Sequence, residues 1–137
     1  MRRPFVWISL VLTWIVLVGI VFQLYFIAAY IFGAGTGALH AHEDLGGAVV
    51  HPAEILVFLV SLGAWWGNWR NIGLSFLLAV VGTAQVFLAG DINKGTNGWL
   101  HGLHGGLVPF VIWIAWLISN REMRTLGVGP RRPSAAV

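Results

Sequence analysis

The sequence predicts an all-α membrane protein, a bundle of four transmembrane helices. Of its 137 residues, 58% are hydrophobic and only 9% are charged, which leaves too little polar surface for a soluble domain of this size. The chain also contains four apolar runs that are long enough to cross a hydrocarbon core of about 30 Å. The runs lack the alternation of polar and apolar residues that a barrel strand needs, so each is predicted to be a helix.

The predicted helices cover residues 5–32, 52–69, 72–89 and 99–118. The first is about 42 Å long at 1.5 Å per residue, so we expect it to tilt or to project beyond the hydrocarbon. It exceeds the apolar stretch of a signal peptide, about 7–15 residues, and is therefore interpreted as an uncleaved span. Residues 1–126 are expected to form a single domain. The Gly-, Pro- and Arg-rich residues 127–137 are expected to form a disordered cytoplasmic tail.

Two starting points fit the second helix. A proline suits the first position of a helix and an acidic residue suits its first turn, which favours a start at Pro52 with His51 as the cap and Glu54 inside. Alternatively, the helix starts near Glu43 and Pro52 kinks it, which membrane helices tolerate. In that case His42 and His51, nine residues apart, point to opposite faces and cannot share one small metal ion.

The arginines predict the orientation of the chain. All seven precede the first span, separate the second span from the third, or follow the fourth, so both termini are expected in the cytoplasm. The opposite loops, residues 33–47 and 91–98, contain one strong base, Lys94, and three acidic residues. All five histidines therefore belong to the outer half. The net charge of +3 therefore reports the topology of the chain. The sequence has no basic stripe with interleaved aromatic residues, so it does not predict nucleic-acid binding.

Histidines near lipid are costly unless they bind something, so five of them at one face are the main functional observation. Bis-histidine ligation of a haem needs one imidazole from each of two facing helices, with small residues beside them. The sequence offers His42 or His51 on the second span and His101 or His104 on the fourth. Glycines flank these histidines at Gly46, Gly47, Gly98, Gly102, Gly105 and Gly106. On the fourth span, Gly98, Gly102 and Gly106 are four residues apart, a spacing that equally fits an ordinary close helix crossing.

A non-haem metal site is the alternative. The chain has no cysteine, so any metal must be held by nitrogen and oxygen ligands. His51 and Glu54 lie three residues apart on one helix face, as do His101 and His104. Together with His42 they fit iron, copper or zinc. Glu54 is, however, the one carboxylate at useful depth, and its place near a helix N-terminus is equally favoured by the macrodipole.

The remaining polar residues of the spans predict no catalysis. Ser61 and Ser75 lie on the cytoplasmic side, away from the histidines, and no nucleophile motif is present. Gln23 and Gln85 are expected to hydrogen-bond neighbouring helices. Support of a bound ligand is the alternative role for Gln85.

Three short motifs resemble an uncharacterised family of small four-helix bacterial membrane proteins, known as a domain of unknown function. They are His42-x-x-Leu45-Gly46, Gln85 with Leu88-Ala89-Gly90, and Leu100-His101 followed by Gly105. The resemblance implies that His42 and His101 form the core pair, and that His40, His51 and His104 are additional.

In its helix count and in the histidines on its second and fourth spans, the chain is also similar to membrane cytochromes of the b type. It departs from their two-haem members because no histidine lies near the cytoplasmic face. This resemblance implies one haem, not a transmembrane pair.

The sequence therefore predicts a multi-pass protein of the bacterial cytoplasmic membrane that binds one haem b in its outer half. It would act in electron transfer or redox sensing, with a quinone or a partner protein as the exchange partner. The alternative is a non-enzymatic membrane subunit, or a protein that binds a small ligand or a non-haem metal with the same histidines. The sequence leaves open a homo-oligomer or a subunit of a larger membrane complex.

Overall fold

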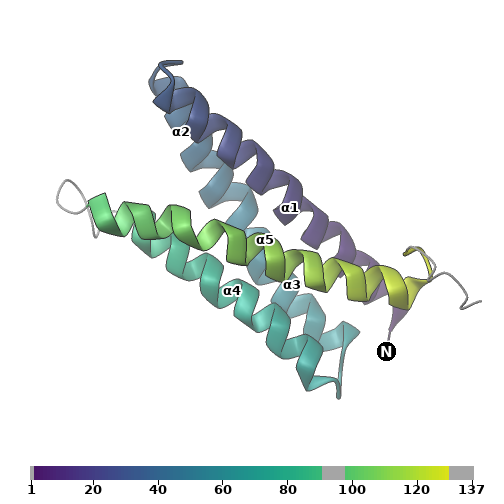
Figure 1. Cartoon of the computed structure of the whole chain (residues 1–137). Helices are drawn as coiled ribbons and strands as arrows, with labels where there is room; N and C mark the ends of the chain where they lie inside the picture. Colours follow the sequence, from purple (N-terminus) through teal and green to yellow (C-terminus); the bar gives the residue numbers. More distant parts are fainter. Residues whose placement is uncertain (1, 91–97, 130–137) are drawn as a thin grey trace, which may run out of the picture.

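The computed structural model describes residues 2–90 and 98–129. These residues form five α-helices and one π-helical segment, and no strand (Figure 1). The elements are α1 (Arg3–Ile31), α2 (Thr36–Leu45), η1 (Gly46–Val50), α3 (His51–Ala64), α4 (Trp69–Ala89) and α5 (Gly98–Leu126). Because α2, η1 and α3 follow one another without a break, the described residues contain four helical segments long and apolar enough to cross a membrane. The all-α fold with four candidate spans is confirmed.

The second span begins at Thr36 and runs through Pro52, as the alternative start near Glu43 expected, but it starts earlier than either predicted position. Glycine, alanine and histidine make residues 36–47 look like a loop, but this stretch packs as a helix along α1. His51 is helical and does not cap; its amide donates to the carbonyl of Gly46, five residues back. The wide π turn lies where Pro52 removes a regular hydrogen bond, which is how a helix passes a proline without breaking.

The ends of the helices at the opposite side also differ from the prediction. The second span ends at Ala64, not at residue 69, because a turn with Gly67 at φ +84° follows it. Trp69 begins α4, and the side chain of Asn68 caps that helix. α5 continues from Ile118 to Leu126, which brings Glu122 into the bundle. Of the predicted tail, residues 130–137 lie outside the described residues, as do Asp91 and Lys94 of the second outer loop.

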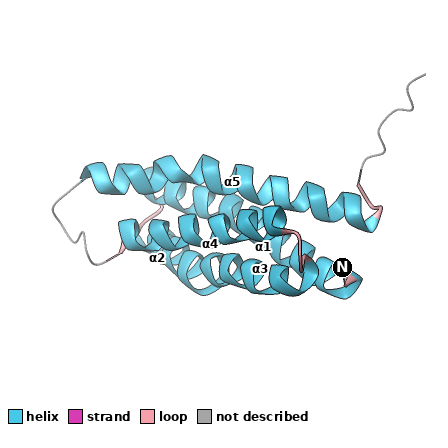
Figure 2. Ribbon diagram, turned by 90° about the horizontal axis from the view of Figure 1, so that it is seen from below, coloured by secondary structure: helices cyan, strands magenta, loops and turns pink. Residues whose placement is uncertain are grey.

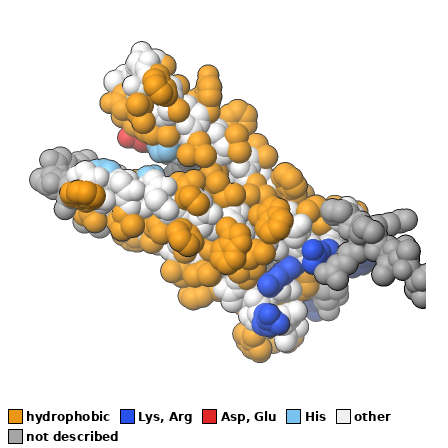
Figure 3. Space-filling view, in the orientation of Figure 1, with side chains coloured by type: hydrophobic (Ala, Val, Ile, Leu, Met, Phe, Trp, Pro, Cys, Tyr) orange, Lys and Arg blue, Asp and Glu red, His pale blue; other side chains and the backbone are white. Residues whose placement is uncertain are grey.

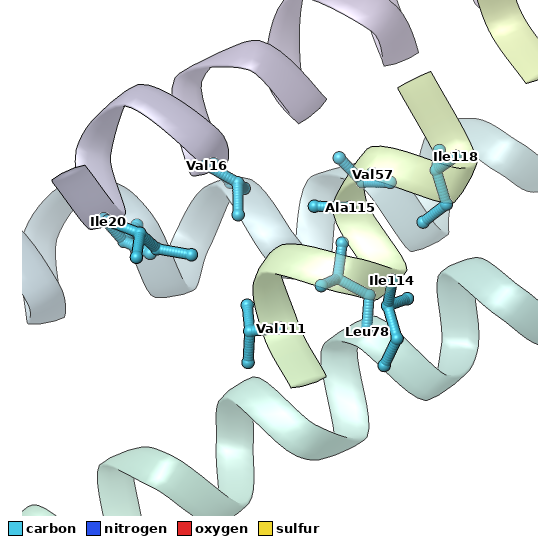
Figure 4. Packing of buried hydrophobic residues seen from close by; sticks show 10 residues of the cluster. Val16, Ile20, Val57, Leu78, Val111, Ile114, Ala115 and Ile118 are labelled. Atoms are coloured by element: carbon cyan, nitrogen blue, oxygen red, sulfur yellow. The ribbon is translucent and has the colours of Figure 1, made fainter. Parts of the chain in front are cut away.

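The bundle consists of two hairpins. α1 and the segment Thr36–Ala64 form the first hairpin, and α4 and α5 form the second. Contacts of α1 with α5 and of α3 with α4 join them (Figures 1 and 2). The joint is an apolar core to which α1, α3, α4 and α5 contribute Val16, Ile20, Val57, Leu78, Val111, Ile114, Ala115 and Ile118 (Figure 4). Towards α2 and the start of α5 the two hairpins diverge (Figure 1).

Charged groups are segregated to the two ends of the bundle (Figure 3). We call one the arginine end, where Arg2, Arg3, Arg70, Arg121 and Arg124 lie, and the other the histidine end, where His40, His42, His101 and His104 lie. Large hydrophobic side chains such as Phe22, Phe76 and Trp113 are exposed between them. An apolar belt between two polar ends is the surface expected of a bundle that lies in lipid.

Candidate functional site

Two histidines from different hairpins meet at the histidine end. His42 lies on α2 and His104 on α5, and both side chains are half-buried. Their ring centroids are 6.3 Å apart and the ring planes are nearly perpendicular, at 86°. The pair therefore bridges the place where the two hairpins diverge, and the space-filling view shows histidine surface in a notch there (Figure 3).

A backbone carbonyl fixes each ring. Nδ1 of His42 lies 3.0 Å from the carbonyl oxygen of Gln23 on α1, and Nδ1 of His104 lies 3.0 Å from that of Gln85 on α4. A carbonyl can only accept, so Nδ1 carries the hydrogen in both rings and Nε2 of the neutral ring keeps its lone pair. Histidines that ligate a metal usually donate their second N–H in this way. Both rings are thus held in the tautomer that a metal ligand requires.

The ring separation also fits a shared metal centre. A metal–nitrogen bond is about 2.0 Å and the ring centre lies about 1.1 Å beyond the nitrogen, so two imidazoles on opposite sides of one ion have centroids about 6 Å apart. The observed separation is 6.3 Å. Edge-to-face packing of two rings tolerates the same distance, but it does not explain the matched carbonyl bonds.

The α5 glycines have open space around them, but Gly102 and Gly106, each two residues from His104, lie on the face of α5 opposite to it. A Cβ atom built on Gly102, Gly105 or Gly106 would meet nothing within 4 Å outside its immediate chain neighbours, and the same holds for Gly98. No other described part of this chain therefore crosses α5 closely at these glycines. An apolar groove of about 490 Å³ runs along α5 from Gly105, and neither histidine of the pair lines it. Its other lining residues are Leu24, Val108, Pro109, Ile112, Trp113 and Trp116.

Gly46 has a different role from the one expected. A Cβ atom at this position would overlap the side-chain amide of Gln23, so Gly46 permits the close approach of η1 to α1. This contact holds the first hairpin together immediately after His42. Gly46 therefore positions a histidine and does not leave room for a ligand.

The other histidines do not join the pair. His40 and His101 are exposed at the same end. The structure brings His104 to His42, whereas the family resemblance implied His101, which lies one turn closer to the start of α5. His51 points elsewhere: its Nδ1 lies 3.3 Å from Oε2 of Glu54, one turn further along α3.

Glu54 is buried against α4, with 3% of its surface exposed. A Cβ atom at Gly82 would overlap its carboxylate, so this group faces α4 of the second hairpin. The histidine pair instead joins α2, which carries His42, to α5, which carries His104. Within residues 2–90 and 98–129 no three His, Asp or Glu side chains lie close enough to hold a metal ion. The predicted set of His42, His51, Glu54, His101 and His104 is therefore not assembled at one place.

Sequence reasoning found Gln23 and Gln85 but expected their side chains to act. The backbone carbonyls make the contacts, and these have no sequence signature of their own. One signal was present: each histidine of the pair follows its glutamine by 19 residues. Glu122, which is fully buried on α5, was missed because the fourth span was expected to end before it.

Comparisons of the chain with protein-family models, with curated proteins and with solved structures find no match. The resemblances to the uncharacterised four-helix family and to b-type cytochromes thus stay predictions. A function has to be argued from the site itself.

Proposed function

We propose that the protein is a membrane-embedded haem protein of the b type, with His42 and His104 as the two axial ligands of one haem. The observation that carries this proposal is the pair of half-buried imidazoles, one from each hairpin, whose Nδ1 atoms are both bonded to backbone carbonyls. This arrangement leaves two Nε2 lone pairs for one ion. Two neutral nitrogen ligands suffice for haem, because the porphyrin supplies the other four.

The surroundings of the pair support a flat apolar group more than a bare ion. Gly105 has open space where a Cβ atom would lie and lines the apolar groove, so it would let a flat macrocycle approach the backbone of α5. The adjoining groove is lined mainly by apolar side chains. A non-haem ion would need a third protein ligand, and the described residues bring none to this place.

The proposed ligation favours electron transfer or redox sensing over chemistry at the iron. With an imidazole on each side, the iron has no open position for oxygen or a substrate. The protein's own contribution is to hold both rings, to exclude water and to surround the haem with apolar side chains. These features tune a reduction potential.

The proposed location is the cytoplasmic membrane of a bacterium, with the arginine end inside and the histidine end outside. The haem then lies in the outer half of the bilayer. Its exchange partner would be a quinone in the lipid or a redox protein at the outer surface. A homo-oligomer or a larger complex is compatible with this arrangement.

Four histidine variants test the ligand assignment. His42→Ala and His104→Ala should each abolish the low-spin bis-histidine spectrum and lower the haem content of the purified protein. Added imidazole should restore the spectrum, because the lost ligand is replaced in kind. His40→Ala and His101→Ala are matched controls, since both residues are exposed at the same end.

The controls should keep wild-type haem content and spectrum. Loss of the spectrum in His101→Ala, with retention in His104→Ala, would move the assignment to the pair that the family resemblance implies. Retention in all four variants would exclude these histidines as ligands.

A further inference from the structure

Buried polar side chains form a layer near the arginine end, well away from the histidine pair. Within the described residues, every buried polar side chain except Glu54 belongs to this layer, and each of the four spans supplies at least one. They are Ser9, Thr13, Ser61, Ser75, Ser119 and Glu122. The layer separates the central apolar core from a second apolar cluster that includes Val6, Leu10 and Leu126.

Most of the layer's hydroxyl groups have local partners. Thr13 donates to the carbonyl of Ser9, Ser61 to that of Phe58 and Ser75 to that of Asn71. Four atoms differ: in the described part of the chain, Oγ of Ser9, Oγ of Ser119 and both carboxyl oxygens of Glu122 have no partner within hydrogen-bond geometry. Buried polar atoms without partners are rare and costly, so four together require an explanation.

The four atoms come from two helices that pack together. Ser119 and Glu122 lie one turn apart on α5, and Ser9 and Thr13 of α1 face the Glu122 carboxyl. Glu122 has an exposed fraction of 0%. The carboxyl group is thus enclosed by hydroxyl groups inside the bundle, close to the last turn of α5.

Among residues 2–90 and 98–129, no Lys or Arg side chain pairs with this carboxyl group. On α5, Arg121 donates to Oδ1 of Asn71 at 2.7 Å, and on α1, Arg3 donates to the carbonyl of Leu126. Arg2, Arg70 and Arg124 are exposed. On α3, Glu54 is the acidic residue inside the bundle, and its side chain is hydrogen-bonded to His51 at 3.3 Å. An ionised Glu122 would therefore be an unpaired buried charge, which is very costly.

We propose that Glu122 is a proton-binding site, occupied when the protein is at rest and exchanging with water at the arginine end. One added proton removes the unpaired buried charge and turns one carboxyl oxygen into a donor beside hydroxyl groups that can accept. The carboxylic O–H donates to one hydroxyl group, and a serine O–H donates to the other carboxyl oxygen. Release breaks the carboxylic O–H bond, passes the proton to water and leaves a carboxylate. The site is independent of the haem proposal.

Infrared spectroscopy of the full chain in lipid bilayers tests this proposal, because a neutral carboxylic acid has a C=O stretch that a carboxylate lacks. Glutamates labelled with ¹³C at the side-chain carboxyl identify the band, since the chain has only Glu43, Glu54 and Glu122. At neutral pH the band should be present in the wild type. It should lose a component in Glu122→Gln and keep that component in Glu54→Gln, the matched control.

A second variant keeps the test decisive if Glu122→Gln does not fold. Ser9→Ala removes one hydroxyl partner, so the same component should persist and shift to higher frequency, as a carbonyl does when it loses a hydrogen bond. Absence of any Glu122 component at neutral pH would overturn the proposal. So would its disappearance on addition of NaCl at constant ionic strength, which would indicate a sodium site.

Discussion

The Nδ1 atom of His42 lies 3.0 Å from the carbonyl oxygen of Gln23, a residue 19 positions earlier in the chain. The same separation and the same distance recur between His104 and Gln85. Each hairpin therefore holds one histidine by a carbonyl of its first helix. The bond fixes both the ring and its tautomer, and the two hairpins bring the two ring centroids to 6.3 Å from one another.

Neighbouring glycines in η1 test how the first hairpin positions His42. Gly46→Ala places a methyl group on the Gln23 side chain, whereas Gly47→Ala meets open space. Gly46→Ala makes the flexible end of the Gln23 side chain move, so this variant should be less stable than Gly47→Ala by up to about 1 kcal/mol and should lower haem content. Gly47→Ala should be neutral or stabilising by up to about 1 kcal/mol. Thermal unfolding in detergent and haem per chain measure both effects, and equal behaviour of the two variants would contradict the packing described.

Glu54 and Gly82 should be energetically coupled across α3 and α4. Gly82→Ala forces the buried carboxylate to move and should destabilise the protein, whereas Gly73→Ala, on the same helix, faces open space. Glu54→Ala removes the clashing group, so the double variant should be more stable than the sum of the single effects by about 0.5–3 kcal/mol. Unfolding free energies of the four proteins give this coupling. Strict additivity would show that the two residues do not touch.

The nearly perpendicular rings predict a particular magnetic signature. If both imidazoles ligate the iron with their planes at 86°, ferric haem should give a highly anisotropic low-spin signal in electron paramagnetic resonance. Two perpendicular planes act on different iron d orbitals and leave these orbitals nearly equal in energy. Parallel planes give a rhombic signal with three resolved features. Low-temperature spectra of the oxidised protein distinguish the two. A rhombic signal would mean that the rings turn, or that another pair binds.

The charge distribution predicts the orientation in the membrane. Both termini should lie in the cytoplasm, because the described arginines gather at the end where α1 begins and α5 ends. A fluorescent reporter fused to the C-terminus should be active, and a phosphatase that matures only outside the cytoplasm should be inactive. The opposite pair of activities would place the histidine end inside.

The four spans could be predicted from the sequence because long apolar runs in lipid have one outcome. The start of the second span could not. Residues 36–47 have a loop-like composition, and their contact with α1 makes them helical. The predicted end of the fourth span, at residue 118, was too early because it also relied on composition alone. Hydropathy falls after Ile118, yet α5 continues and buries Glu122 between apolar clusters.

The candidate site could be predicted only as a set of histidines. Residue spacing alone places His101 and His104 on nearly one face, so it does not choose between them. The choice depends on which ring reaches the carbonyl of Gln85, and this follows from how α4 packs on α5. Likewise, only the packed bundle shows that Glu54 faces Gly82, away from the histidine pair.

The optical absorption spectrum of the wild-type protein, purified from cells supplied with haem, tests the central claim most directly. The account predicts a Soret band, and on reduction a sharp α band typical of bis-histidine ligation, with about one haem per chain. A colourless protein that also takes up no haem when it is added to the purified chain would contradict the account.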